Sequence, residues 1–154
     1  MRCKFGLFAL LLVIVFKARS QSTVALIDEV VAKLKSDLIS FRKVDKLNSE
    51  TGYRSLYYFN NEPVAIEVVE KGRIEKRVSW FFYKTRLIYT ETIWTDTLFA
   101  RKVHEEKTYH YEEAMIAWLD SENTFVEASS AEFVDLDKSL RVYGRKIYRE
   151  ALEE

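Results

Sequence analysis

The sequence repeats one pattern three times: Tyr57-Tyr58-Phe59, Phe81-Phe82-Tyr83 and Tyr109-His110-Tyr111, each followed by a short polar spacer and then an apolar run. The apolar runs are Val64-Ala65-Ile66, Leu87-Ile88-Tyr89 and Met115-Ile116-Ala117. The copies begin 24 and 28 residues apart, which fits a repeated β-hairpin better than a helical repeat. The pattern therefore predicts a six-stranded antiparallel meander.

The predicted strands are rich in aromatic and β-branched residues and are separated by turn residues; they cover 53–59, 64–70, 73–83, 86–94, 101–111 and 114–119. In 73–83 the even positions, such as Val78 and Trp80, are apolar, and most odd positions are polar, which predicts one buried and one solvated face. Phe81 and Tyr83 add aromatic side chains to the second face. Lys71-Gly72 predicts a tight turn with Gly72 at positive φ.

An amphipathic helix is expected on each side of this sheet in the sequence. Apolar residues between Val24 and Phe41 recur in steps of three and four, which predicts a helix over 23–47, ended by the polar residues before Gly52. A second helix is predicted over 129–150, with Ser129 and Glu132 in a capping box. The expected fold is therefore one α+β domain over 21–154, with the sheet at 53–119.

The first twenty residues are typical of a secretory signal peptide. Arg2 and Lys4 form a basic start, the apolar run from 6 to 16 has eleven residues, and Ala18 and Ser20 are small residues before the expected cut. Eleven apolar residues fall short of the roughly 20 that span a bilayer. We therefore expect export to a periplasm or the cell exterior, with no transmembrane segment in the mature chain.

Composition limits what the mature chain does. Cys3 is the single cysteine and lies in the predicted signal peptide, so no disulfide or thiol chemistry is expected. Removal of four basic residues with the signal leaves 20 basic against 24 acidic residues, a net charge of −4. Such an evenly mixed acidic surface argues against nucleic acid as a partner.

The aromatic triplets, their spacers and the apolar runs over 57–119 resemble MORN-type hairpin repeats in small exported bacterial proteins of unassigned function. MORN hairpins carry glycines at set positions, whereas the spacers here are Asn60-Asn61, Lys84-Thr85 and Glu112-Glu113. The resemblance implies a repeated-hairpin architecture, and no functional residue is transferred from it.

No catalytic, cofactor-binding or metal-binding residue is predicted. His104 and His110 lie about 20 Å apart along one strand, too far to share a metal, and are expected on the solvated sheet face, each at best paired with Glu106. The chain has no Gly-x-Ser-x-Gly elbow and no phosphate-binding glycine loop. No cofactor is expected, and an enzyme is the less favoured class; a metal-dependent enzyme that uses His104 or His110 is kept as a third hypothesis.

The aromatic content is the feature that exceeds ordinary structural needs, although a core and cross-strand pairs would account for much of it. We expect a non-catalytic binding domain that uses an aromatic sheet face or an edge strand. The alternatives are a cone-shaped domain that encloses a small apolar ligand, and an enzyme of unknown reaction. The partner would be a protein, a glycan or an apolar ligand. The candidate binding surface is Tyr57, Phe59, Phe81, Tyr83, Tyr89 and Trp94.

Overall fold

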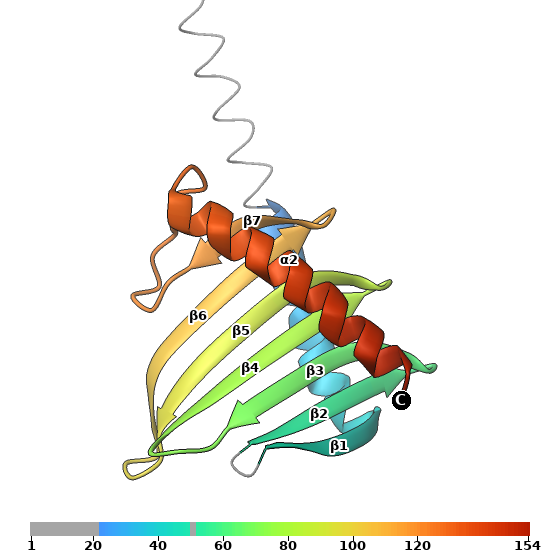
Figure 1. The fold of residues 1–154 in the computed structure, drawn as a ribbon. Helices are drawn as coiled ribbons and strands as arrows, with labels where there is room; N and C mark the ends of the chain where they lie inside the picture. The colour runs from blue at the N-terminus through green and yellow to red at the C-terminus, as the bar shows by residue number, and fades with distance from the viewer. Residues whose placement is uncertain (1–21, 50–51) are drawn as a thin grey trace, which may run out of the picture.

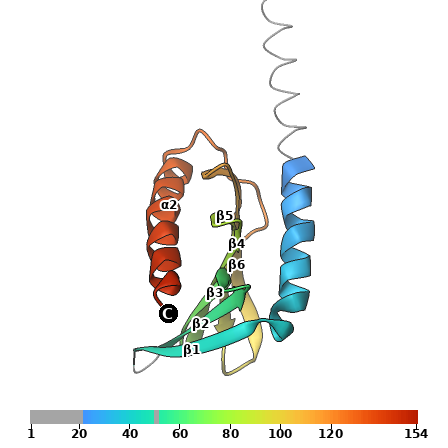
Figure 2. The same cartoon turned by 90° about the vertical axis from the view of Figure 1, so that its right-hand side faces the viewer.

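The computed structural model describes residues 22–49 and 52–154 and shows an α+β fold, in which two helices lie on opposite faces of one antiparallel sheet (Figure 1, Figure 2). The predicted signal peptide, 1–20, lies outside the described residues. Within the described ranges, no helix is long and apolar enough to cross a membrane.

The sheet has seven strands in sequence order, each antiparallel to its neighbours. Their bounds are β1 Arg42–Ser49, β2 Gly52–Phe59, β3 Glu62–Glu70, β4 Ile74–Tyr83, β5 Arg86–Asp96, β6 Arg101–Tyr111 and β7 Ala114–Leu119. The six predicted strands correspond to β2 to β7, with ends that agree within two residues. The prediction of six strands was wrong by one, because β1 was assigned to a helix.

The N-terminal helix is shorter than the predicted range 23–47. Its described residues are 22–37, and a 3-10 turn over Leu38–Ser40 follows. Phe41 continues the helical spacing of apolar residues, but its backbone is extended and its ring lies 5.6 Å from that of Phe59. The helical spacing of apolar residues therefore continues by chance into residues that form a 3-10 turn and then strand β1.

Strand β1 forms because its side chains alternate between partners on the two faces of the sheet. The guanidinium of Arg42 lies 4.3 Å from the ring of Tyr58, and Val44 packs beside the core on that same face. Lys43 and Asp45, at the intervening positions, form an ion pair on the other face. Pairing with β2 along this length outweighs helix propensity, since tertiary contacts override that weak preference.

The C-terminal helix, α2 Ala131–Leu152, crosses the sheet diagonally (Figure 1). Ser130, not Ser129, is its N-cap: the Ser130 hydroxyl accepts a hydrogen bond from the backbone N–H of Phe133 at 3.2 Å. Glu132 therefore lies one position too early to complete the predicted capping box, and the helix starts two residues later than predicted and ends at Leu152 rather than 150.

Both sheet faces are buried under helices, so the expectation of a solvated second face was wrong over much of the sheet. Under α2, Ile147, Tyr148 and Ala151 pack on the sheet residues Leu56, Tyr58, Ile66, Trp80 and Phe82. Under the N-terminal helix, Ile27 and Val31 pack on Ala65, Phe81, Tyr89, Tyr109 and Ala117. Figure 2 shows the sheet between the two helices. The second face therefore forms a core of its own.

Candidate functional site

Three hairpins, β2–β3, β4–β5 and β6–β7, repeat the same local geometry. Each has a two-residue turn with positive φ at both positions, as a type I′ turn requires. The turn residues are Asn60-Asn61, Lys84-Thr85 and Glu112-Glu113. Each returning strand also carries one extra residue opposite the aromatic triplet: Val64, Ile88 or Ile116. Gly72, in contrast, is not at positive φ, contrary to the sequence prediction.

The second and third hairpins separate at their tips. The last pair between β5 and β6 is Tyr89 with Tyr109. The first residues of β5, Arg86 to Ile88, and the last residues of β6 are paired within their own hairpins but not with each other. This separation places His110 at an opening between two hairpins rather than within a continuous ladder.

His110 occupies the same position in the third hairpin as Tyr58 and Phe82 in the first two. All three side chains are buried, with exposed fractions of 4% for Tyr58, 2% for Phe82 and 1% for His110. Tyr58 Oη donates to the carbonyl of Ala151 at 2.7 Å, and the Phe82 ring lies 4.9 Å from that of Tyr148. The expectation that His110 lies on a solvated face was therefore wrong.

Only one nitrogen of His110 is engaged. His110 Nε2 lies 2.8 Å from Thr108 Oγ1, which lies 2.6 Å from Thr90 Oγ1. His110 Nδ1 has no hydrogen-bond partner within the described part of the chain. Burial lowers the pKa of His110 to about 4, opposed in part by Asp137, so the imidazole is neutral at pH 7. A buried polar atom without a partner is unusual in a folded protein, so Nδ1 is available to a water molecule or another group from outside the chain.

A cleft of about 470 Å³ lies between α2 and the tips of the second and third hairpins. We call it the His110 cleft. It is lined by Phe82, Thr85, Arg86, Leu87, His110, Glu113, Arg141, Gly144, Arg145, Tyr148, Arg149 and Leu152. Gly144 lets α2 approach the sheet, because a Cβ there would lie 3.2 Å from Leu87 Cδ2. The lining combines an apolar floor with a cationic side that α2 supplies.

A second cavity, of about 500 Å³, lies between the N-terminal helix and the same hairpin tips. Its lining is mostly apolar and includes Leu26, Ile27 and Val30 of that helix. The two cavities share Arg86, Leu87 and His110 as lining residues. The imidazole therefore lies in a thin wall between cavities that open toward different helices.

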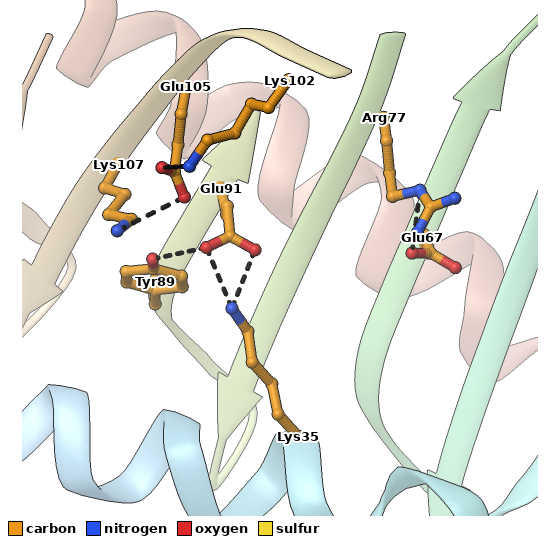
Figure 3. A network of polar contacts seen from close by, with 8 residues as sticks. All are labelled: Lys35, Glu67, Arg77, Tyr89, Glu91, Lys102, Glu105 and Lys107. Carbon is orange, nitrogen blue, oxygen red and sulfur yellow. Dashed lines mark hydrogen bonds and ion pairs between the residues drawn. The ribbon is translucent and has the colours of Figure 1, made fainter. Parts of the chain in front are cut away.

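A polar network on the face under the N-terminal helix is satisfied internally (Figure 3). Lys35 Nζ lies 2.8 Å from Glu91 Oε2, and Tyr89 Oη donates to Glu91 Oε1 at 3.1 Å. Burial raises the pKa of Tyr89, and the nearby Glu91 carboxylate adds to the shift, so the hydroxyl remains a donor. Further along this face, Glu105 contacts Lys102 and Lys107, and Arg77 contacts Glu67. The Lys35–Glu91 ion pair attaches the helix to the sheet, while the other contacts join residues of the strands.

The six residues of the predicted binding surface do not form one surface. Phe81 and Tyr89 are buried under the N-terminal helix and Tyr57 is half-buried, while Phe59 and Tyr83 are exposed at the hairpin tips. Trp94 lies toward the other end of β5, where its ring centroid is 4.4 Å from that of His104. Phe59 and Tyr83 instead belong to a different set, the third aromatic of each triplet, which Tyr111 completes.

His104 contacts Glu106 Oε1 through Nε2 at 2.9 Å, the pairing that the strand spacing allowed. Among residues 22–49 and 52–154, no group of three or more His, Cys, Asp and Glu side chains is placed to hold a metal. Sequence reasoning considered His110 as a solvated residue or a metal ligand, and missed its burial in the wall of a cleft. Alignment of the three triplets would have found it, since it places an imidazole where the other copies have Tyr58 and Phe82.

Comparison of the chain with protein-family models, with curated proteins and with solved structures finds no match.

Proposed function

We propose that this protein is a small exported binding domain that holds a small ligand in the His110 cleft. The observation that carries the proposal is the His110 Nδ1 atom, which is buried at the cleft wall without a partner in the described chain. A nitrogen in that state has a free-energy cost of about 1–3 kcal/mol unless another molecule reaches it. A bound ligand that accepts or donates there removes the cost.

The lining of the cleft supports a ligand of mixed character. Phe82, Leu87 and Leu152 provide apolar contact, while His110 and Tyr148 provide polar atoms. Tyr148 Oη is also buried without a partner in the described residues. Binding sites for small molecules are typically concave, largely apolar and equipped with a few placed polar groups.

Binding is favoured over catalysis because two carboxylates are already engaged: Glu113, which lines the cleft, and Asp137, whose charge acts on His110. Glu113 Oε2 lies 2.6 Å from Arg145 Nη2, and Asp137 Oδ2 lies 2.8 Å from Arg141 Nη2. A general acid or base needs a proton-exchanging group that is free to act on a substrate.

The proposal that the protein is exported is supported by the basic, apolar and small residues of 1–20. The proposal that it belongs to a MORN-like class is supported by the three equivalent hairpins.

The test is a titration of the purified, isotope-labelled protein with the apolar fluorophore 1-anilinonaphthalene-8-sulfonate, followed by amide chemical shifts. We expect one saturable site, with shifts concentrated in 82–87, 110–113 and 141–152. No saturable binding, or shifts centred on the exposed aromatic residues Phe59, Tyr83 and Tyr111, would contradict the proposal.

A second candidate, a protein partner, is favoured by those exposed aromatic residues. The third residue of each triplet is about half exposed at a hairpin tip: Phe59 is 55% exposed, Tyr83 52% and Tyr111 54%. The three hairpin tips lie at the same end of the sheet, so these exposed apolar side chains offer contact area to a partner. This candidate predicts that the triple variant F59S/Y83S/Y111S loses partner binding and retains fluorophore binding, whereas His110→Phe does the reverse. If either variant lost both partner binding and fluorophore binding, the result would count against a separate protein-binding surface.

A further inference from the structure

We infer that the ligand of the His110 cleft carries an oxyanion, a carboxylate or a phosphate, on an apolar body. This inference rests on the proposed function and specifies the chemistry of its ligand. It follows from the direction of the hydrogen bonds at His110, from the balance of charges around the cleft and from its apolar floor.

The hydrogen-bond chain Thr90–Thr108–His110 favours a donor at the cleft wall. Thr90 Oγ1 and Thr108 Oγ1 are buried, and Thr108 is the single side-chain partner seen for Thr90 in the described chain. If Thr90 donates to Thr108 and Thr108 donates to His110 Nε2, every hydroxyl proton is used and the imidazole proton is on Nδ1. In the opposite direction the Thr90 proton would have no acceptor, at a cost of about 1–3 kcal/mol. The neutral imidazole therefore presents Nδ1–H, which suits an acceptor oxygen.

The charges around the cleft favour an anion. Four arginines line it, and two of them are neutralised: Arg141 by Asp137 and Arg145 by Glu113. Arg86 and Arg149 have no carboxylate partner in the described part of the chain. Arg86 from β5 and Arg149 from α2 are exposed arginines that line the same cleft and keep their charge uncompensated within the described residues. Guanidinium groups bind carboxylate and phosphate in a bidentate geometry, so these two arginines favour an oxyanion as ligand.

The rest of the cleft is suited to hydrocarbon. Phe82, Leu87 and Leu152 line it, and about 470 Å³ of volume exceeds the needs of an inorganic anion. Each methylene group that such a surface removes from water contributes about 0.8 kcal/mol. An amphiphile with a compact anionic head therefore satisfies the polar and apolar parts together.

The test compares four probes by calorimetry on the purified protein at pH 7: octanoate, octyl phosphate, 1-octanol and inorganic phosphate. We expect octanoate or octyl phosphate to bind about ten-fold or more tightly than 1-octanol, and inorganic phosphate to bind more weakly than octyl phosphate. The tighter of the two octyl anions identifies the headgroup. Equal affinity for 1-octanol and both anions overturns the inference and leaves the proposed function standing, while no binding of any probe overturns both.

Two variants assign the effect to residues. Arg86→Met with Arg149→Met retains apolar contact and is expected to remove the advantage of the anions over 1-octanol. Arg73→Met is the matched control, because Arg73 is an exposed arginine beside the opposite end of β4. His110→Phe, which fills the wall with the residue type of the second hairpin, is expected to weaken anion binding about ten-fold. Unchanged anion binding in both altered proteins would overturn the inference.

Discussion

The first hairpin, β2–β3, and the third hairpin, β6–β7, share one backbone geometry but carry different side chains at equivalent positions. In the first, Asn60-Asn61 form the turn, and Tyr58 Oη is satisfied by the Ala151 carbonyl. Asparagine tolerates positive φ better than most residues do. In the third, Glu112-Glu113 adopt the same left-handed conformation and His110 leaves one nitrogen without a described partner. We therefore expect the third hairpin to be locally less stable than the first, at the point where it lines the His110 cleft.

The largest difference between the copies is expected from truncation at equivalent positions. Phe82→Ala should lower the free energy of unfolding by about 3–5 kcal/mol, because it removes a buried ring that packs on Tyr148. His110→Ala should cost less, because the ring that it removes also carries an unpartnered polar atom next to an open cleft, and this gain offsets part of the loss of the Thr108 hydrogen bond. Urea denaturation of both variants measures the difference, and equal losses would show that the two positions are energetically alike.

The next effect is a dependence of stability on pH that the third hairpin alone introduces. Burial lowers the pKa of His110 from 6.5 to about 4, so below pH 6.5 the unfolded chain takes up a proton that the folded chain does not. Stability should therefore fall as the pH decreases from about 6.5 to 4, by roughly 3 kcal/mol from this group. Asp137 and Arg141 face the imidazole and act on its pKa in opposite directions.

His110→Phe is the matched control for that pH dependence. The carboxylates common to both proteins titrate in each, so the difference between the two stability curves reports His110. We expect the curves to diverge between pH 6.5 and 4, with the wild type losing more stability. Parallel urea midpoints over that range would show that His110 is not held neutral by burial.

Substitutions in the turns should change the free energy of unfolding by smaller amounts. A non-glycine residue at positive φ costs roughly 1–2 kcal/mol, and asparagine is the favoured replacement in a type I′ turn. Glu112→Asn should raise the free energy of unfolding by about 1 kcal/mol, and the converse change, Asn60→Glu, should lower it by about the same amount. Thermal denaturation of both variants provides the measurement. A loss of stability in Glu112→Asn would mean that Glu112 makes a favourable contact that outweighs its backbone strain.

The smallest effect is expected at Gly144. Alanine gains about 1 kcal/mol of helix propensity over glycine, but its Cβ would lie 3.2 Å from Leu87 Cδ2. Leu87 borders the cleft and can yield, so the net change in the free energy of unfolding should stay within about 0.5 kcal/mol. Urea denaturation tests this directly. A loss several times larger would show that the approach of α2 to the sheet is rigid.

Strand positions were predictable because each strand carries its own local signals. Period-two alternation in β4 and the threefold repeat located six strands within two residues of their observed ends. Strand β1 was not predictable in that way. Its sequence continues the apolar spacing of the preceding helix, and its strand conformation depends on pairing with β2, a tertiary effect that the spacing does not contain.

The candidate site was less predictable than the fold. The aromatic residues chosen from sequence include Phe81 and Tyr89, which the N-terminal helix buries. Strand alternation identifies a face but not which helix covers it. His110 was assigned to a solvated face because its β6 neighbours Glu106 and His104 are polar, and α2 covers the sheet only at the end where His110 lies. Comparison of the three repeat copies would have identified His110 as a buried residue, whereas the alternation within β6 did not.

The most direct test of the account is the ¹⁵N spectrum of the imidazole rings at pH 7, with His104 as the internal reference. The added ligand is whichever of octanoate and octyl phosphate binds more tightly. We predict that His110 is neutral, carries its proton on Nδ1, and shifts at Nδ1 when this anion binds while His104 does not. A His110 protonated on Nε2, or an unchanged Nδ1 signal at saturating anion, would contradict it.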